Sequence, residues 1–302
     1  MQALFIGQAY IDVTFLADQL PRGDEKSIAR DYAVSFGGNA VTAAFCCAKL
    51  GGEPELLCSQ ADDWLARMFL DMAAKYGICI HGRKVRESSL SFIMPKDGKR
   101  AIVRCRDNDF LHPFPPLTLT GMKALHVDGH MPDAALHYAK TCRELGILTS
   151  LDGGAVRADT DELLGSIDVP VVSERFCQQL GKSEGETLAY LRSKGCRVGA
   201  VTLGEHGTVW YANGGPDQHM PSLDVPMEKV IDSNGAGDVF HGAYIASYLK
   251  NPHRDWQDHF HFARGASTHA IQHLGNENSL PSLDDVGRAR AEFSEKSVHA
   301  LN

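Results

Sequence analysis

The sequence predicts an α/β fold in which helices flank a central, mainly parallel sheet and a small second β-sheet stands beside it. Short apolar runs typical of buried strands alternate with longer helical segments through most of the chain, and this alternation indicates a parallel sheet. Two strand-rich stretches, at about residues 14–36 and 88–106, do not follow the alternation. We therefore expect a single domain over residues 1–302, with these two stretches forming the small sheet.

Residues 3–7 form a short apolar run, which predicts a buried strand. The next predicted elements are a helix at 38–50, a strand at 55–59 and a helix at 63–76. The first helix is small and apolar throughout and ends at Gly51-Gly52, so we expect it to pack tightly on the sheet. Asp63 stands near the start of the second helix, where an acidic side chain is favourable.

The segment Lys96-Asp97-Gly98-Lys99 predicts a hairpin turn, because Asp-Gly is common in tight turns between antiparallel strands. It joins strand-like runs at 89–95 and 100–106. The later predicted elements are strand 122–128, helix 133–145, strands 147–152 and 167–173, helix 184–194, strand 198–203, a hairpin at 210–220, and helices 236–250, 255–273 and 283–296.

The composition argues against binding to nucleic acid or to a membrane. The chain has 30 Lys and Arg against 38 Asp and Glu, a formal charge of −8, and a negative surface repels a phosphate backbone. The opening MQALFIGQAYID carries no basic leader, and the longest near-apolar run, at 40–48, is too short to cross a bilayer. The 8 cysteines form no C-x-x-C pair, so we expect reduced thiols in a cytoplasmic protein.

The stretch DSNGAGDVFHG at 232–242 contains the clearest candidate for a catalytic site. Gly235, Ala236 and Gly237 leave the backbone accessible where a helix is predicted to begin. The first amides of a helix lack internal partners and carry the positive end of its dipole, so they can bind a phosphate. Asp238 follows directly. It can be only a favourable first-turn acid, or it can take a proton from a hydroxyl while the amides stabilise a phosphoryl group in transfer.

The longer stretch DSNGAGDVFHGA resembles the D-T-x-G-A-G-D-x-F-x-G-A signature of the ribokinase/PfkB family of carbohydrate kinases, with Ser233 in place of Thr. Gly37-Gly38-Asn39 is similar to the G-G-N motif of the ketohexokinase/fructokinase-like branch. The resemblance implies a Rossmann-like (ribokinase-like) fold with a β-sheet lid over the sugar. It also implies transfer of the γ-phosphoryl group of ATP with Mg²⁺, with Asp238 as the base and Gly235 to Gly237 as the anion hole.

The resemblance further implies binding roles for residues along the whole chain. The substrate would be held by Asp12, Gly37, Gly38 and Asn39. The nucleotide would be held by Ser173, Thr202, Gly204, Gly207, Gly237, Gly275 and Asn276. A monovalent cation, for which K⁺ is the candidate, would lie near Asp232. The segment TLGEHG at 202–207 can also be only a hairpin turn that follows a strand.

One family motif is changed in this sequence. Many members carry N-x-x-E after the strand that corresponds to 167–173, and the Glu helps to organise magnesium through water. Here Ser173 stands in place of the Asn and Phe176 in place of the Glu. This change leaves open a non-catalytic member that senses a ligand or binds a partner, although the intact signature around Asp238 argues against it.

Basic side chains on the expected lid suggest an acceptor with an anionic group. Arg100, Arg104 and Arg106 share one face of an alternating strand. They can form an ordinary solvated face, or Arg104 and Arg106, together with Lys26, can pair with a carboxylate, phosphate or sulfonate. We therefore expect a sugar or sugar-like acceptor, with a sugar phosphate or a nucleoside as alternatives. The exposed face of the lid predicts a homodimer in which two lids pack together.

Overall fold

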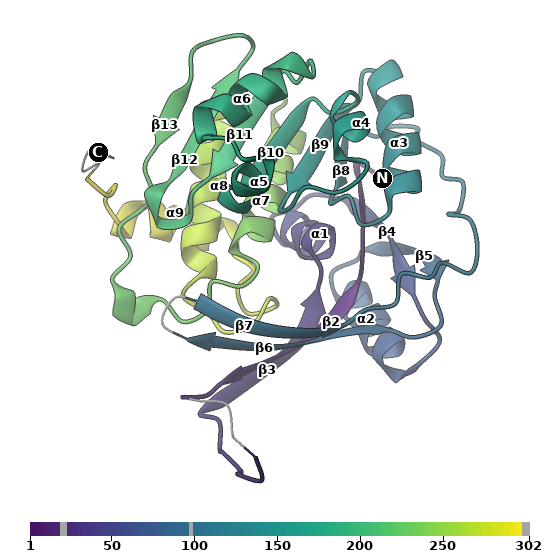
Figure 1. Cartoon of the computed structure of the whole chain (residues 1–302), viewed down its shortest axis with the longest axis vertical. Coiled ribbons are helices and arrows are strands. Elements are labelled where there is room, and N and C mark those ends of the chain that lie inside the picture. The colour runs from purple at the N-terminus through teal and green to yellow at the C-terminus, as the bar shows by residue number, and fades with distance from the viewer. Residues whose placement is uncertain (19–22, 97–98, 298–302) are drawn as a thin grey trace.

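A nine-stranded sheet forms the centre of the molecule, which the computed structural model describes over residues 1–18, 23–96 and 99–297 (Figure 1). Its strand order is β13-β12-β11-β10-β9-β8-β1-β4-β5. The strands are β1 (Ala3–Gly7), β4 (Pro54–Gln60), β5 (Cys79–Lys84), β8 (Ala124–Val127), β9 (Leu148–Gly153), β10 (Val169–Ser173), β11 (Val198–Thr202), β12 (Thr208–Ala212) and β13 (Gln218–Met220). Antiparallel pairing is confined to the β11–β12–β13 edge of this described sheet. The predicted mainly parallel sheet is confirmed.

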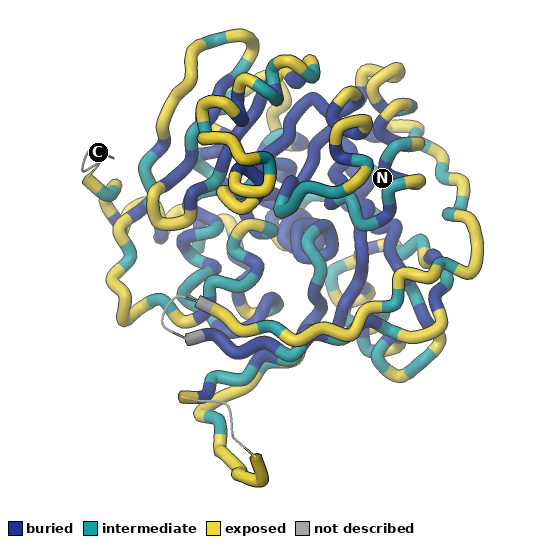
Figure 2. Tube along the Cα trace, in the orientation of Figure 1, coloured by how far each residue is buried: buried dark blue, intermediate teal, exposed yellow. Residues whose placement is uncertain are grey.

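Helices cover both faces of the central sheet, as the alternating pattern predicts, and Figure 2 shows its strands buried between them. One apolar core joins the sheet to α1 (Asn39–Lys49), α2 (Trp64–Lys75), α7 (Ala236–Lys250), α8 (Trp256–Ala270) and α9 (Leu283–Glu292). A second core joins the other face to α3 (Pro132–Glu144), α4 (Thr160–Leu164), α5 (Glu174–Leu180) and α6 (Glu184–Ser193). In the described chain, no helix is both long and apolar enough to span a membrane.

A separate four-stranded sheet forms the lid and runs across one end of the domain in Figure 1. Its strands, in the order β3-β2-β6-β7, are β3 (Asp31–Gly37), β2 (Tyr10–Leu16), β6 (Ser89–Lys96) and β7 (Lys99–Cys105). The sheet begins at Tyr10, earlier than the expected start at residue 14, and so includes Asp12. The pairing of Lys96 with Lys99 confirms the β6–β7 hairpin, although its Asp97-Gly98 turn lies outside the described residues.

Some elements have no counterpart among the predictions, and each has a local reason. Strand β5 reads CIHGRK, a polar sequence that suits an exposed edge strand and carries no apolar run. Helices α4 and α5 are too short to show a helical period. By contrast, the expected role of Asp63 is confirmed, because its side chain accepts a hydrogen bond from Ala66 N (2.8 Å) at the start of α2.

Candidate active site

The turn before α7 has the geometry of an anion site. Gly235 lies in the left-handed region with φ of 74°, and a Cβ there would come within 2.5 Å of Asn276 Oδ1. The first helical bond runs from Val239 N to Gly235 O (2.8 Å), so the amides of Ala236, Gly237 and Asp238 precede the helical ladder. No side chain of the described residues caps this helix. The turn can therefore direct several amide protons at one phosphate.

The space in front of the turn is open. A Cβ at Gly237 would meet no atom within 4 Å in the described part of the chain, and Gly237 is exposed. Further along α7, the helix packs closely against α1, because a Cβ at Gly242 would come within 2.3 Å of Ala43 O. A ligand can therefore approach the backbone at Gly237, whereas the backbone at Gly242 is covered.

Asp238, at the start of α7, has a strongly raised pKa. Burial by the surrounding atoms, followed by the negative charge of Asp152, raises the pKa of Asp238 to about 8, although Arg100 acts in the opposite direction. A carboxylate with a pKa near neutral is suited to exchange a proton with a hydroxyl. The carboxyl group and the open amides lie on the same first turn of α7, so the candidate base and the candidate anion site are next to each other.

Asp152, at the carboxyl end of β9, links this base to the predicted substrate site. Its Oδ2 accepts a hydrogen bond from Asn39 Nδ2 (2.8 Å), and its Oδ1 lies 3.5 Å from His241 Nε2. Burial raises the pKa of Asp152 above its usual value. Burial also lowers the pKa of His241 to about 3, so this histidine is neutral at physiological pH. The Asn39 amide is therefore fixed by a buried carboxyl group that also acts on Asp238.

Behind Asp152, a chain of buried polar side chains continues into the core. His241 Nδ1 lies 2.9 Å from Tyr244 Oη, Tyr244 Oη lies 2.5 Å from Ser150 Oγ, and Ser150 Oγ lies 3.0 Å from His126 Nδ1. Burial lowers the pKa of His126 to about 3. These groups hydrogen-bond to one another in the core and hold β9 against α7, while His126 Nε2 has no partner among the described residues.

Asp12, in β2, places a carboxylate on the lid face that is turned toward the site. It is buried, and its Oδ2 accepts a hydrogen bond from Asn276 Nδ2 (3.0 Å). Asp12 Oδ1 and the neighbouring Ser91 Oγ are buried and have no hydrogen-bond partner within the described chain. Unpaired buried polar atoms are costly, so this pair is suited to bind the hydroxyl groups of a ligand. Burial raises the pKa of Asp12.

The two glycines after β3 are required by close contacts. A Cβ at Gly37 would lie 2.3 Å from the Asp12 carboxylate. Gly38 has φ of 105°, and a Cβ there would lie 2.0 Å from Gln8 O. Both positions therefore need glycine for the backbone to pass Asp12 and to start α1 at Asn39.

The lid arginines separate into two groups. In the cross-strand row Ser35–Asp12–Ser91–Arg104, Arg104 lies on the same face as Asp12, and its guanidinium group stands 5.0 Å from the Tyr10 ring centroid. The charge of Arg106, which follows β7, also acts on Tyr10.

Arg100 instead reaches the catalytic turn, where its Nη1 donates to Ser233 O (3.4 Å). Lys26 is exposed in the segment between β2 and β3. Arg104, Arg106 and Arg100 are exposed as well, so their charges are available to a ligand. The structure thus brings two of the predicted arginines to the neighbourhood of Asp12, whereas the third meets the loop before Asp238.

The predicted nucleotide residues Ser173 and Thr202 end the neighbouring strands β10 and β11. Ligands of parallel α/β sheets bind outside such carboxyl ends. Gly204 and Gly207 shape the following 3-10 turn η1 (Gly204–His206), and a Cβ at Gly207 would lie 2.2 Å from Met220 O. Ser173 itself caps α5, since its Oγ accepts from Phe176 N (3.3 Å).

Gly275 and Asn276, which were expected to line the nucleotide, lie between the lid and the catalytic turn. Gly275 N donates to Asp232 Oδ2 (3.2 Å), and a Cβ at Gly275 would lie 2.5 Å from Ala33 Cβ. Asn276 Nδ2 donates to Asp12 and also to Phe36 O (2.9 Å), while its Oδ1 accepts from Asn234 Nδ2 (3.2 Å). The structure therefore connects Asn276 to the substrate side of the site.

The structure offers a clearer position for the predicted monovalent cation than for the predicted Mg²⁺. Asp232 is buried, and its oxygens accept from Asn234 N (2.8 Å) and Gly275 N. This buried negative charge fits a nearby monovalent cation. For Mg²⁺, the family's glutamate position is taken by Phe176, which is fully buried in the second core, and the adjacent Glu174 is exposed. The carboxylates of Asp152 and Asp128 act electrostatically on Asp238, but within the described residues these three acids form no group with metal-ligand spacing.

Asp128, Asp152 and His241 are absent from the predicted site. Asp128 Oδ2 accepts from Ala40 N (3.3 Å) at the start of α1, and a Cβ at Gly7 would lie 2.1 Å from the same oxygen. A signal for both acids exists in the sequence, because each comes at the end of a predicted strand, at 122–128 and 147–152. The carboxyl ends of parallel strands meet at the ligand-binding edge of the sheet.

A parallel α/β domain with a β-lid over an open helix start and a buried carboxylate is typical of enzymes that transfer a phosphoryl group to a small molecule. The chain belongs to the PfkB family of carbohydrate kinases, since the family described as "pfkB family carbohydrate kinase" matches residues 2–283. It is therefore a carbohydrate kinase. The strand order and the lid agree with the ribokinase-like fold that the resemblance implies.

Individual relatives support the same family. The chain is 29% identical over 262 residues to the ATP-dependent ribose-1-phosphate kinase of Halopiger xanaduensis, covering 82% of this chain and 85% of that protein. It is 22% identical over 308 residues to the ribokinase of Mus musculus, covering 93% and 92%. The structure of Arabidopsis thaliana ribokinase with ribose and ATP superposes with a TM-score of 0.77 at 21% identity, covering 97% of this chain and 99% of that one. The ketohexokinase/fructokinase-like branch stays a prediction.

Proposed function

We propose that the protein transfers the γ-phosphoryl group of ATP to a hydroxyl of a sugar that carries an anionic group. One observation carries the proposal: the base candidate Asp238, with its pKa raised to about 8, stands beside the open amides of Ala236 and Gly237. A base with this pKa can remove a hydroxyl proton, and the amides can stabilise the charge of the transferred group. Relatives named ribokinase and ribose-1-phosphate kinase support ATP as the donor.

The acceptor is expected to bind between Asp12 on the lid and Asn39 at the start of α1. Asp12 Oδ1 and Ser91 Oγ are buried and unpaired within the described residues, so they can bind two sugar hydroxyls. Asn39 is oriented by Asp152, which leaves its amide oxygen free to accept a third. Such contacts hold the reacting hydroxyl near Asp238 and supply the positioning that phosphoryl transfer requires.

In the reaction, Asp238 takes the proton of the acceptor hydroxyl as the oxygen attacks the γ-phosphorus. The bond from the γ-phosphorus to the β–γ bridging oxygen breaks, and ADP leaves with the electron pair of that bond. The amides of Gly235 to Gly237 donate to the transferred oxygens, and Arg100 adds a positive charge at the same turn. Mg²⁺ bound to ATP would supply charge neutralisation of the phosphates. We place a K⁺ ion near Asp232, where it would stabilise the turn.

The nucleotide is expected to lie outside the carboxyl ends of β10 and β11, against Ser173, Thr202 and the η1 turn. In this position its phosphates can extend toward Gly237, in front of which the described structure is open. The 8 cysteines are all free, which fits the reducing cytoplasm where ATP is available.

The anionic group of the acceptor is expected to bind Arg104 and Arg106. Arg104 extends from the same face of the lid as Asp12, and Arg106 follows two residues later. A guanidinium group binds a phosphate or carboxylate through paired hydrogen bonds. The relative of Halopiger xanaduensis is named for a phosphorylated sugar, which supports a sugar phosphate as one such acceptor.

An ATP-consumption screen tests the proposal directly. Neutral sugars, sugar phosphates, sugar acids, a sulfonated sugar and adenosine are offered to the full chain with MgATP, and formation of the phosphorylated product is confirmed by mass spectrometry. We expect the highest kcat/KM for an acceptor that combines a hydroxyl chain with an anionic group. A clear preference for adenosine would instead identify a nucleoside kinase. Absence of product with every acceptor would contradict the proposed reaction.

A further inference from the structure

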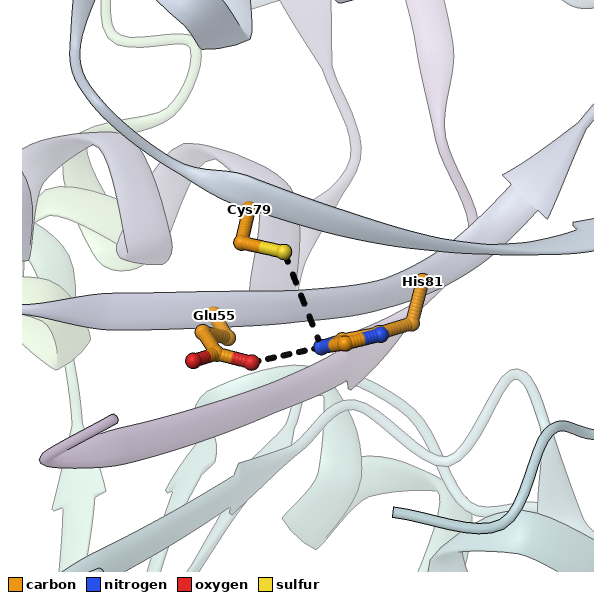
Figure 3. A group of neighbouring side chains, drawn as sticks. All are labelled: Glu55, Cys79 and His81. Atoms are coloured by element: carbon orange, nitrogen blue, oxygen red, sulfur yellow. Dashed lines mark hydrogen bonds and ion pairs between the residues drawn. The ribbon is translucent and has the colours of Figure 1, made fainter. Parts of the chain in front are cut away.

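The amino end of the sheet edge carries a group of side chains that the kinase reaction does not use. Glu55 of β4 and Cys79 and His81 of β5 offer three potential ligand atoms, all within 4.8 Å of one another (Figure 3). These residues stand near the starts of their strands, whereas Ser173 and Thr202 mark the carboxyl ends where the active site lies.

Strand register explains why the three side chains meet. β4 and β5 pair in parallel with Glu55 opposite Cys79 and Leu57 opposite His81. Leu56 and Ile80 pack against the first core, so the residues on either side of them project from the other face of the sheet. Glu55, Cys79 and His81 therefore share one face across two adjacent strands, as Figure 3 shows.

The distances are close to those of a tetrahedral metal site. His81 Nε2 lies 2.6 Å from Glu55 Oε2 and 4.0 Å from Cys79 Sγ. Bond lengths to Zn²⁺ of about 2.1 Å for nitrogen and oxygen and about 2.3 Å for sulfur place such ligand pairs about 3.4 Å and 3.6 Å apart. The nitrogen–oxygen distance must therefore widen and the nitrogen–sulfur distance must shorten by less than an ångström, which side-chain rotation can supply.

The three side chains are partly exposed, so an ion and a water ligand can reach them. Cys79 is exposed, and the side chains of His81 and Glu55 are 23% and 25% exposed. Six other cysteines of the chain are buried, and only Cys105, on the lid, is exposed like Cys79 among the described residues. An exposed thiol beside an imidazole and a carboxylate differs from cysteines that serve as small apolar side chains.

We propose that Glu55, Cys79 and His81 form a binding site for a Zn²⁺ ion that joins the edge strand β5 to β4. Thiolate, imidazole and carboxylate together are the ligand set that Zn²⁺ accepts, whereas Mg²⁺ and Ca²⁺ prefer oxygen atoms. In the metal-free protein the proton shared between His81 Nε2 and Glu55 Oε2 forms a hydrogen bond.

Protection from alkylation tests the site with a control inside the same molecule. The full, reduced chain is treated with iodoacetamide with and without Zn²⁺, and the modified peptides are quantified by mass spectrometry. We expect Zn²⁺ to slow alkylation of Cys79 and to leave the rate at Cys105 unchanged. Mg²⁺ should protect neither cysteine. An unchanged rate at Cys79, or equal slowing at both cysteines, would overturn the proposal.

Variants then assign the other two ligands. Glu55→Gln and His81→Gln retain Cys79, and each should remove its protection by Zn²⁺. Co²⁺ should give a thiolate-to-metal absorption band in the unmodified chain and in Cys105→Ser, but not in Cys79→Ser. Persistence of the band in Cys79→Ser would place the metal elsewhere. Kinase activity with MgATP should be the same in Cys79→Ser as in the unmodified chain, because the site lies at the opposite ends of the strands.

Discussion

Asp238 combines a raised pKa with a position at the start of α7, and both properties bear on its replacement by asparagine. Asp238→Asn keeps the size of the side chain and removes the base. We expect kcat to fall by about 10²- to 10⁴-fold, the usual contribution of a general base, while the affinity for ATP changes little. Single-turnover kinetics and a nucleotide-binding titration measure the two effects. A variant with unchanged turnover would exclude Asp238 as the base.

The same carboxyl group makes folding depend on pH. The pKa of Asp238 rises from 3.8 to about 8 on folding, so the folded chain binds a proton that the unfolded chain has already lost in this interval. The free energy of unfolding contributed by this group therefore decreases as pH rises from about 4 to about 8. We expect the Tm of Asp238→Asn to exceed that of the unmodified chain by a margin that grows over this interval. A constant difference in Tm across the pH series would contradict the raised pKa.

Replacement of Arg104 tests whether the acceptor carries an anionic group. If its guanidinium group binds the anionic group of the acceptor, Arg104→Ala loses a charge-assisted hydrogen bond worth about 1.5–3 kcal/mol, and KM for that acceptor rises about 10- to 100-fold. KM for ATP should stay nearly constant. Arg288→Ala, which removes an exposed arginine paired with Asp285 on α9, is the matched control and should change neither constant. Equal increases of both KM values in Arg104→Ala would indicate a structural role.

The sequence predicts the residues of the site that belong to local motifs, and misses those that only the fold brings in. Asp238 and its glycines stand in one short stretch with a characteristic order. Asp152 lies outside any recognisable motif, and His241 occupies a variable position between Phe240 and Gly242 of the signature, so the sequence marks neither as a site residue. Their closeness to Asn39 arises from the pairing of β9 with its neighbours and the packing of α7, which a local pattern does not contain.

At the scale of elements, the start of α1 depends on Gly38. An alanine there would adopt φ of 105° and would also bring its Cβ to 2.0 Å from Gln8 O. Gly51 is the matched control, because its φ is also positive (91°) and a Cβ there meets no described atom within 4 Å. We expect Gly51→Ala to cost about 1 kcal/mol of stability from backbone strain alone, and Gly38→Ala to cost clearly more.

Urea denaturation of both variants measures this difference in free energy of unfolding. Equal losses in the two variants would show that the contact with Gln8 O relaxes at no cost. If Gly38→Ala is too unstable for this measurement, its KM for the acceptor still shows whether the start of α1 is disturbed, because Asn39 directly follows the substituted position.

The alternation of strands and helices is predicted well because each element carries its own period of apolar residues. The helix at 38–50 is one example, because its small apolar residues mark it in the sequence. The β6–β7 hairpin is another, because its Asp-Gly sequence indicates a tight turn. Edge strand β5 is missed, because an edge position removes the apolar pattern that marks buried strands. The lid boundary is displaced for a related reason: residues 10–12 are buried like a strand of the main sheet, yet they pair with β3 and β6.

At the scale of the whole molecule, the outer face of the lid is apolar and exposed. Val34, Phe92 and Val103 lie in one cross-strand row, and the Phe15 ring stands 5.7 Å from that of Phe92. Val103 is 66% exposed. An apolar sheet face of this kind favours association with a second copy, so the homodimer through the lid remains our proposal.

Introduction of a charged residue on this face tests whether the chain dimerises through the lid. We expect Val103→Glu to shift the chain from dimer to monomer in light scattering coupled to size-exclusion chromatography, because a carboxylate is costly to bury in an apolar interface. Leu145→Glu, which changes an exposed apolar residue at the end of α3, should leave the mass unchanged. A monomeric unmodified chain, or a dimer that persists in Val103→Glu, would contradict a lid interface.

The hydrogen bond from Asn276 to Asp12 spans 264 positions of the sequence, and Asn276 also contacts Asn234 beside the phosphate turn. During synthesis, the carboxylate of Asp12 therefore leaves the ribosome long before its partner Asn276 does. A nascent chain that stops short of Asn276 therefore lacks this link between the lid and the turn before α7.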